Sequence, residues 1–217
     1  MTTHPTPPAP PEPNAQLATS HPSQEVLEFL AKRRSTPIKI FDTNAIGPTP
    51  EQLDGLLQIA ARVPDHRKLE PWRFIIIEGD ARAKLGEAIA DIRRAEDPNA
   101  SEADIKEDKL RFLRAPVVVI VVSSPDHGHK TPVWEQELSA GAACMNLLLA
   151  SRAAGWSGAW LSEWCAFSKG IDTILELSSA ERVAGFIYIG QSLPPVPERP
   201  RPNMALKVTR WGESCAE

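Results

Sequence analysis

Apolar residues recur along the chain in two patterns, which predict helices and strands. Spacings of three and four residues predict helices, whereas short runs rich in β-branched residues predict strands. Helices are expected to open after Ser23 and Thr49, and to cover residues 81–95, 101–113, 134–153 and 169–177. Strands are expected at residues 72–78, 117–123, 159–162 and 183–190. The unbroken apolar run at 117–123 is typical of a strand buried on both faces at the centre of a sheet.

The longest predicted helix, residues 134–153, is apolar or small around nearly its whole circumference. Such a helix is buried on all sides. In a chain of this length, we expect another subunit to cover one of those sides. The small side chains of residues 139–143 would permit a neighbouring helix to approach closely.

Prolines cluster at both ends of the chain. Residues 1–22 are rich in Pro, Thr, Ala and Ser, and they predict a disordered arm because they can bury too little apolar surface to offset the ordering entropy. Residues 23–217 are then expected to form a single domain. The Pro-rich segment after Gly190 should lie along the surface or along a partner subunit.

Composition narrows the possible partners. The 217 residues are 42% hydrophobic and 24% charged, which is the profile of a soluble globular domain. A net charge of −4 gives no general electrostatic case for binding nucleic acid. The longest apolar run, residues 117–122, is too short to span a bilayer. We expect neither nucleic acid nor a membrane as a partner.

The cysteines indicate the compartment. Cys144, Cys165 and Cys215 are odd in number and lack the spacing of metal ligands. Reduced thiols in the cytoplasm fit this pattern best, and no secretory signal precedes them. His127 and His129 have no cysteine nearby, so no metal site is expected.

Four cations lie in residues 62–73, with His66 among them. Two prolines stiffen this loop, and Trp72 adds a large flat surface where the next strand begins. A rigid, cation-rich loop at a strand end suits a planar anionic ligand such as a nucleotide-type cofactor. A solvated connection whose indole caps the core remains an equal alternative.

A second group of cations ends the first predicted helix. Arg33, Arg34 and Ser35 stand just before Pro37, which blocks the helix from continuing. Two guanidinium groups and a hydroxyl can hold a phosphate through forked hydrogen bonds. Cations in a last turn also stabilise the helix dipole, so ordinary capping remains the alternative.

The chain lacks a nucleophile elbow, an HExxH motif, a Walker loop and a GxGxxG motif. Asp65 and His66 could form a general-base pair, although adjacent side chains seldom point the same way. A flavin enzyme needs no dedicated acid, base or nucleophile, because the ring carries the hydride while the protein positions it. Such a site needs cations for the phosphate and flat side chains near the ring, which Trp72, Trp134 and Trp160 could supply.

Four motifs, taken together and in order, resemble the nitroreductase family, and most closely its short-chain, YdjA-like branch of NAD(P)H nitroreductases. The first is Arg33-Arg34-Ser35, and the second is the triplet Pro-Asp-His at 64–66 followed by Pro-Trp at 71–72. The third is Trp-Glu-Gln-Glu-Leu-Ser-Ala-Gly at 134–141, and the fourth is Gly-Trp-Ser-Gly-Ala-Trp at 155–160. The resemblance extends over about residues 24–210. It implies an α+β fold around a central mixed sheet flanked by helices, and an intertwined homodimer with FMN at the interface.

The resemblance also assigns roles to residues, none of them catalytic. It implies that the FMN phosphate and ribityl chain are held by Arg33, Arg34 and Ser35. It implies that FMN bound chiefly by the partner subunit is reached by Arg62 and His66. The flavin would be lined by Trp160, Leu161 and Ser162. Two departures stand out: Pro37 and Leu161 occupy positions where the family often has a basic residue, so Leu161 would contact the flavin through its backbone.

By the same resemblance, the reaction is ping-pong. NAD(P)H reduces FMN and leaves, and a nitroaromatic, quinone or related electron-poor acceptor then takes the electrons. One alternative is a flavin-binding sensory or storage protein with the same fold and little turnover. Another is a structural or adaptor protein that acts through its Pro-rich arm.

Overall fold

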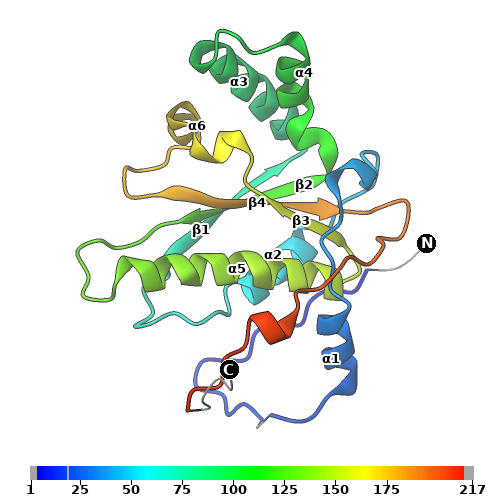
Figure 1. Cartoon of the computed structure of the whole chain (residues 1–217), viewed down its shortest axis with the longest axis vertical. Coiled ribbons are helices and arrows are strands. Elements are labelled where there is room, and N and C mark those ends of the chain that lie inside the picture. Colours follow the sequence, from blue (N-terminus) through cyan, green and yellow to red (C-terminus); the bar gives the residue numbers. More distant parts are fainter. Residues whose placement is uncertain (1–3, 19, 213–217) are drawn as a thin grey trace, which may run out of the picture.

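The computed structural model describes residues 4–18 and 20–212 (Figure 1). The α-helices are α1 (Gln24–Ala31), α2 (Pro50–Ala60), α3 (Ala81–Glu96), α4 (Glu102–Leu110), α5 (Val133–Ala153) and α6 (Lys169–Ile174). The strands are β1 (Trp72–Glu78), β2 (Val117–Ser123), β3 (Ser157–Leu161) and β4 (Arg182–Gly190). Short 3₁₀ turns are η1 (Ile38–Ile40), η2 (Arg111–Arg114), η3 (Trp164–Phe167) and η4 (Met204–Leu206).

The strands of the described residues form one sheet in the order β1-β2-β4-β3, and every pair is antiparallel. The expectation of a mixed sheet is therefore wrong for this part of the chain. The connection from β1 to β2 leaves and re-enters the sheet at one end, because Glu78 pairs with Val117. The central position and complete burial of β2 confirm the prediction from its apolar run.

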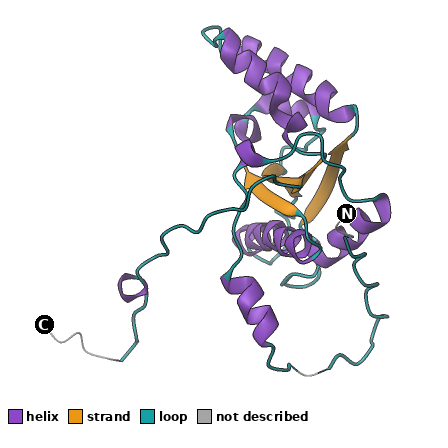
Figure 2. Cartoon of the chain, turned by 90° about the vertical axis from the view of Figure 1, so that its right-hand side faces the viewer, coloured by secondary structure: helices purple, strands orange, loops and turns teal. Residues whose placement is uncertain are grey.

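Side chains of β2 alternate between two cores, as the pleat of a strand requires. Val118, Ile120 and Val122 pack on one face of the sheet, in the core that also contains Phe112 of η2. Val117, Val119 and Val121 pack on the other face, against α2 and α5. The result is three layers, with α2 and α5 below the sheet and α3, α4 and α6 above it (Figures 1 and 2).

Helix α5 is buried on only part of its circumference. Cys144 and Leu147 are fully buried, whereas Trp134, Leu138 and Met145 are 67%, 54% and 36% exposed. The prediction of burial on all sides is thus wrong within one chain. The exposed apolar residues recur at helical spacing and form a row, so one apolar face of α5 is left uncovered by the described residues of its own chain.

The N-terminal arm touches the body of the molecule through His4. Its ring stacks on Trp156 with centroids 3.6 Å apart, and its Nδ1 lies 3.0 Å from the backbone oxygen of Ala154. The amide of Gln52 donates to the His4 backbone oxygen over 2.8 Å. That residues 1–22 form a disordered arm stays a prediction, and residues 1–3 and 19 lie outside the described residues.

The C-terminal segment runs away from the three layers as an extended arm (Figure 2). Leu206 is 78% exposed, and Trp211 is fully exposed at its far end. The prediction that this segment lies along a partner subunit stays a prediction.

Two helices are shorter than predicted. The helix expected over residues 101–113 ends at Leu110 and tightens into η2, where the side chains of Arg111 and Phe112 turn inward and are buried. The helix expected over residues 169–177 ends at Ile174. Both endings fall where the chain must turn back toward the sheet.

Close packing of α3 on α4 depends on Gly86. A Cβ added at this position would overlap the backbone oxygen of Lys109. Alanine normally stabilises a helix by about 1 kcal/mol relative to glycine. Gly86→Ala should nevertheless lower the free energy of unfolding by about 1–3 kcal/mol, measured by urea denaturation, because the two helices must separate.

A matched control is Lys84→Ala in α3, which changes an exposed side chain of the same helix and leaves Gly86 in place. This variant should be as stable as the original chain or more so. Equal stability changes in the two variants would contradict the close approach of α3 and α4.

Candidate functional site

A pocket of about 630 Å³ opens beside the C-terminal end of α5. Its wall contains Arg33 and Arg34 from the end of α1, Arg152 from the last turn of α5, and the start of β3. The Thr36 N–H donates to the Gly158 oxygen over 2.9 Å, which attaches the segment after α1 to the edge strand. This backbone bond holds the two adjacent arginines over the pocket.

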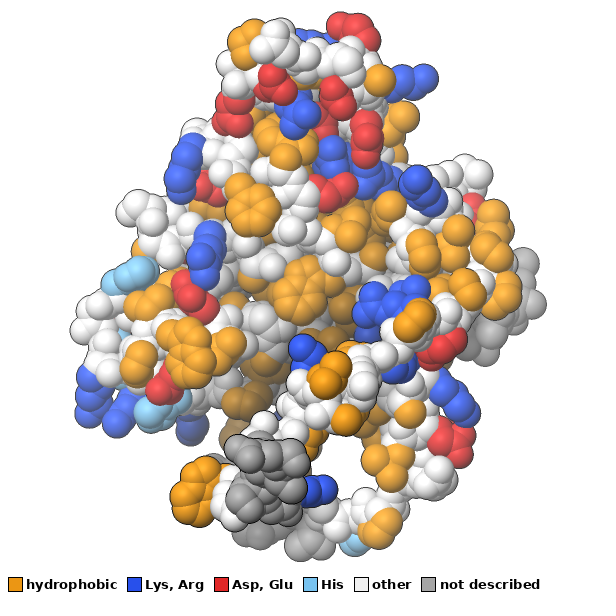
Figure 3. Space-filling model, viewed as in Figure 1, with side chains coloured by type: hydrophobic (Ala, Val, Ile, Leu, Met, Phe, Trp, Pro, Cys, Tyr) orange, Lys and Arg blue, Asp and Glu red, His pale blue; other side chains and the backbone are white. Residues whose placement is uncertain are grey.

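The pocket carries net positive charge, because Lys32, Arg33, Arg34 and Arg152 line it with one carboxylate, that of Glu198. Glu198 pairs with Arg201 over 2.9 Å. Burial and the charges of neighbouring arginines lower the pKa of Arg33; these neighbours are Arg201, Arg199, Arg152 and Arg34. Figure 3 shows Lys and Arg side chains gathered where the C-terminal arm crosses beside α5. Like charges this close repel one another, so a bound anion would stabilise the group.

Arg34 gives the pocket a specific need for an acceptor. Its Nη1 donates to the Ser35 backbone oxygen over 3.1 Å, and Arg33 Nη1 donates to Ser35 Oγ over 3.4 Å. Arg34 Nε, however, is buried with no hydrogen-bond partner among the described residues. A buried donor without an acceptor is costly, so the site fits a ligand group with several anionic oxygens, such as a phosphate.

Sequence reasoning missed Arg152, which lines this pocket, and two cations close to Arg33, Arg199 and Arg201. Arg152 has the position of an ordinary dipole partner in a last helical turn. Arg199 and Arg201 lie in the Pro-rich tail, where two arginines flanking a proline were the only available signal. Their place at the site depends on the course of the tail, which Arg201 attaches to α1 by donating to the Ala31 oxygen over 3.3 Å.

Strand β3 leads from this pocket to the other expected flavin residues. Trp160 Nε1 donates to the Ala184 oxygen over 3.1 Å, and its indole covers Gly185, where any Cβ would overlap the ring. Leu161 packs against the core beneath α3, α4 and η2, which we call the cap. Ser162 is exposed and lines a second pocket of about 440 Å³. Trp160 and Leu161 of β3, and Ser162 directly after it, thus follow in the chain from the strand end to which Thr36 attaches the arginine segment.

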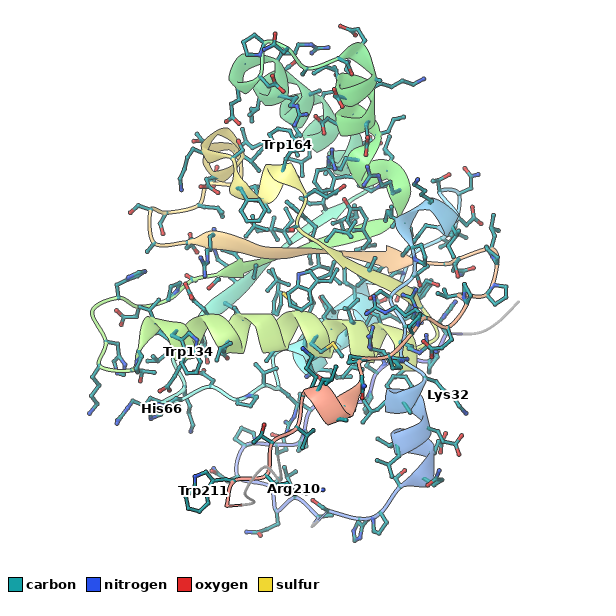
Figure 4. All side chains as sticks on the ribbon, viewed as in Figure 1. Lys32, His66, Trp134, Trp164, Arg210 and Trp211 are labelled. Atoms are coloured by element: carbon teal, nitrogen blue, oxygen red, sulfur yellow. The ribbon has the colours of Figure 1, made fainter. Side chains whose placement is uncertain are left out.

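His66 lies far from the arginines within one chain. Figure 4 shows His66 and Trp134 near the N-terminal end of α5 and Lys32 beside the opposite end. The 21 residues of α5 extend over about 30 Å. His66 Nδ1 is 2.7 Å from Glu135 Oε2, at a pocket of about 340 Å³ that Leu138 also lines.

The loop that carries Arg62 and His66 is held by two polar side chains of α5. Ser139 Oγ donates to the Pro64 oxygen over 2.7 Å and accepts from Trp72 Nε1 over 3.1 Å. The amide of Asn146 donates to the Arg62 oxygen over 3.3 Å. Arg62 itself is exposed beside the middle of α5. The loop is therefore a fixed part of the α5 face.

Asp65 shapes the remainder of the loop. Its carboxylate accepts from the N–H groups of Leu69 over 3.1 Å and Glu70 over 2.8 Å. Arg67, Lys68 and Glu70 have φ angles of 74°, 55° and 50°, a left-handed conformation that side chains disfavour. Because Asp65 bonds the backbone and His66 bonds Glu135, the two adjacent side chains do not form the general-base pair that was considered for them.

Comparison with known proteins assigns the family. A model of the "Nitroreductase family" matches residues 30–191. The chain is 34% identical over 168 residues to "Putative NAD(P)H nitroreductase YdjA" of Escherichia coli (strain K12), covering 76% of this chain and 87% of that protein. It is 32% identical over 170 residues to a Haemophilus influenzae protein with the name "Putative NAD(P)H nitroreductase", covering 78% and 89%. The chain belongs to the nitroreductase family, which is a family of oxidoreductases, as the motifs predicted.

Solved structures confirm the predicted α+β, nitroreductase-like fold. A nitroreductase-like family protein from Bacillus cereus has a TM-score of 0.73 at 22% identity, covering 91% of this chain and all of that one. A Bacteroides fragilis nitroreductase solved with bound FMN has a TM-score of 0.63 at 19% identity, covering 87% and 100%. Across the described residues, the apolar length of every helix falls short of a membrane span.

The left-handed loop should loosen when its internal acceptor is removed. Asp65→Ala deletes both carboxylate acceptors, so the amides of Leu69 and Glu70 should exchange their hydrogens at least about tenfold faster, equivalent to losing about 1.4 kcal/mol of local stability. Native-state hydrogen exchange measures this effect. Asp54→Ala, which removes an exposed carboxylate in α2, serves as the control. Unchanged exchange at both amides in Asp65→Ala would disprove this role.

Proposed function

We propose that this chain is an FMN-dependent oxidoreductase. It takes hydride from NAD(P)H and passes electrons to nitroaromatic, quinone or related electron-poor acceptors by a ping-pong mechanism. The supporting observation is the pocket lined by Arg33, Arg34 and Arg152, which we call the arginine pocket. There a buried Arg34 donor has no acceptor among the described residues, and β3 leads on to the indole of Trp160. Family membership and the FMN bound to the Bacteroides fragilis nitroreductase support the same cofactor.

The residues of this chain would bind and orient the cofactor. Arg33, Arg34 and Ser35 would hold the phosphate and ribityl chain, with Arg152 adding charge from α5. Trp160, Leu161 and Ser162 would line the ring. Bound FMN supplies the hydride and electron transfer, so the side chains need only position it and exclude water. We assign no catalytic side chain.

We also propose a homodimer that shares each FMN site between subunits. Arg62 and His66 lie along α5 away from the arginine pocket of their own chain, so they would serve an FMN held chiefly by the partner. The exposed apolar row of α5 offers surface that a second copy would cover. The extended C-terminal arm offers more (Figure 2).

A cytoplasmic setting is part of this proposal. Cys144 and Cys165 are free, buried thiols, and burial raises the pKa of each to about 12, which keeps them protonated. Cys215 lies outside the described residues.

The phosphate assignment predicts the effect of removing one arginine. Arg33→Ala should weaken FMN binding by about tenfold to a hundredfold, because a charge-assisted hydrogen bond contributes about 1.5–3 kcal/mol. FMN titration followed by flavin fluorescence measures the change. Arg94→Ala removes an exposed arginine of α3 and should bind FMN as the original chain does. Equal affinity in both variants would refute the assignment.

Turnover separates the enzyme from a sensory or storage protein. NADH or NADPH should bleach the bound flavin, and a nitroaromatic compound or quinone should restore its colour over repeated cycles. A flavin that bleaches and recovers its colour only once, over hours, would favour a sensory or storage protein. A wild-type chain that neither carries nor takes up FMN would reject both functions.

The shared site predicts that dimerisation and FMN binding change together. Leu138→Glu places a charge in the exposed row of α5, so it should convert a dimer to a monomer in analytical ultracentrifugation and weaken FMN binding at least about tenfold, or 1.4 kcal/mol. Leu110→Glu alters an exposed leucine of α4 that is 48% exposed, compared with 54% for Leu138, and should change neither property. A monomeric wild-type chain that binds FMN tightly would contradict the shared site.

A further inference from the structure

Glu163 follows Ser162 in an unusual backbone conformation. Its φ is 57° and its ψ is −179°. This region is populated almost only by glycine, because the Cβ of other residues collides with the backbone there. A residue of another type remains in it only when the surrounding structure holds it. The strained residue stands directly after Trp160, Leu161 and Ser162, the residues that would line the flavin.

Two arginines of η2 hold the side chain of Glu163. Its Oε1 pairs with Arg114 Nη1 over 2.8 Å and also with Arg111. Its Oε2 accepts from the Tyr188 hydroxyl over 3.4 Å. Burial favours the neutral acid, but the two guanidinium groups outweigh it and lower the pKa of Glu163 overall. The carboxylate is thus charged and fully engaged.

The next residue of the turn is held from the same side. Trp164 Nε1 donates to Asp108 Oδ1 over 2.9 Å, and Arg93 lies 4.9 Å from the centre of the Trp164 ring. Asp108 also accepts from Arg111 Nε over 3.0 Å, so both charges belong to one buried network. Figure 4 shows Trp164 directly beneath the cap of α3 and α4. Cap residues therefore fix the chain after Ser162.

Apart from the Cys165 thiol, which donates to the Ser162 oxygen over 3.9 Å, few contacts fix Ser162. Pairing of β3 with β4 ends at Leu161 and Phe186, so Ser162 lies beyond the last sheet partner. With Trp164 anchored, a return of Glu163 to an ordinary negative φ would rotate the peptide that joins it to Ser162. The backbone of Ser162 would then move relative to the pocket that it lines.

We propose that Glu163 is a positioning residue, which the arginines of η2 lock in a glycine-type conformation so that Leu161 and Ser162 are held in place against the flavin. This inference rests on the proposed FMN function. It differs from a purely structural role, in which the ion pairs would stabilise the fold without altering the flavin site.

Replacing Glu163 with two small residues separates these roles. Both Glu163→Ala and Glu163→Gly lose the ion pairs, but only glycine adopts a φ of about 57° without strain. Glu163→Ala should bind FMN about tenfold more weakly than wild type and shift the absorbance bands of the bound flavin. Glu163→Gly should retain FMN affinity within about threefold and keep the wild-type spectrum.

Glu176 provides a matched control outside the site. It is an exposed glutamate after α6 with a φ of 54°. Glu176→Ala and Glu176→Gly should both bind FMN as wild type does, with the glycine variant the more stable of the two. Equal FMN affinity and spectra in Glu163→Ala and Glu163→Gly would overturn the proposal, whatever their melting temperatures.

A double-mutant cycle tests the lock even if Glu163→Ala fails to fold. Arg114→Met removes one guanidinium and keeps the aliphatic stem. It should weaken FMN binding severalfold in the wild-type background and leave it unchanged in the Glu163→Gly background, where no lock is needed. Equal losses in both backgrounds would overturn the proposal. A wild-type chain that binds no FMN would instead reject the proposed function.

Discussion

Burial of β2 on both faces is the constraint on which the other elements depend. Val118, Ile120 and Val122 require a helical layer above the sheet, and Val117, Val119 and Val121 require another below it. Burying one such apolar side chain stabilises the fold by about 1.5–3 kcal/mol relative to leaving it exposed. The strand gains this on both faces only if both helical layers are present. The two layers also cover the two faces of β3, with α5 on one face and the cap on the other.

Helix α5 organises the candidate site by its length. Its C-terminal end contributes Arg152 to the arginine pocket, while Ser139 and Asn146 hold the loop of Arg62 and His66 further toward its start. Residues separated in this way meet at one ligand only if a second helix lies alongside the first. The exposed apolar row of α5 is consistent with that arrangement, since it is the surface left over after the sheet has been covered.

The polar interactions divide into two kinds. At the arginine pocket, like charges repel one another and Arg34 Nε has no partner among the described residues, so a bound anion would stabilise the site. Around Glu163, opposite charges satisfy one another and maintain a strained backbone. The arginine pocket thus has the charge to bind an anionic ligand. The ion pairs of Glu163 fix the backbone near the place where that ligand would lie.

The sequence by itself determined the strands of residues 72–78 and 117–123, the capping of α1 and α2, and the family, because these depend on local spacing and short motifs. Only the tertiary structure decided that the sheet is antiparallel, that Arg199 and Arg201 return to Arg33, and that Asp65 serves the backbone rather than His66. Those outcomes depend on where distant segments meet, and local spacing carries no information on that. The same reason hid Glu163, whose conformation is set by arginines about fifty residues earlier in the chain.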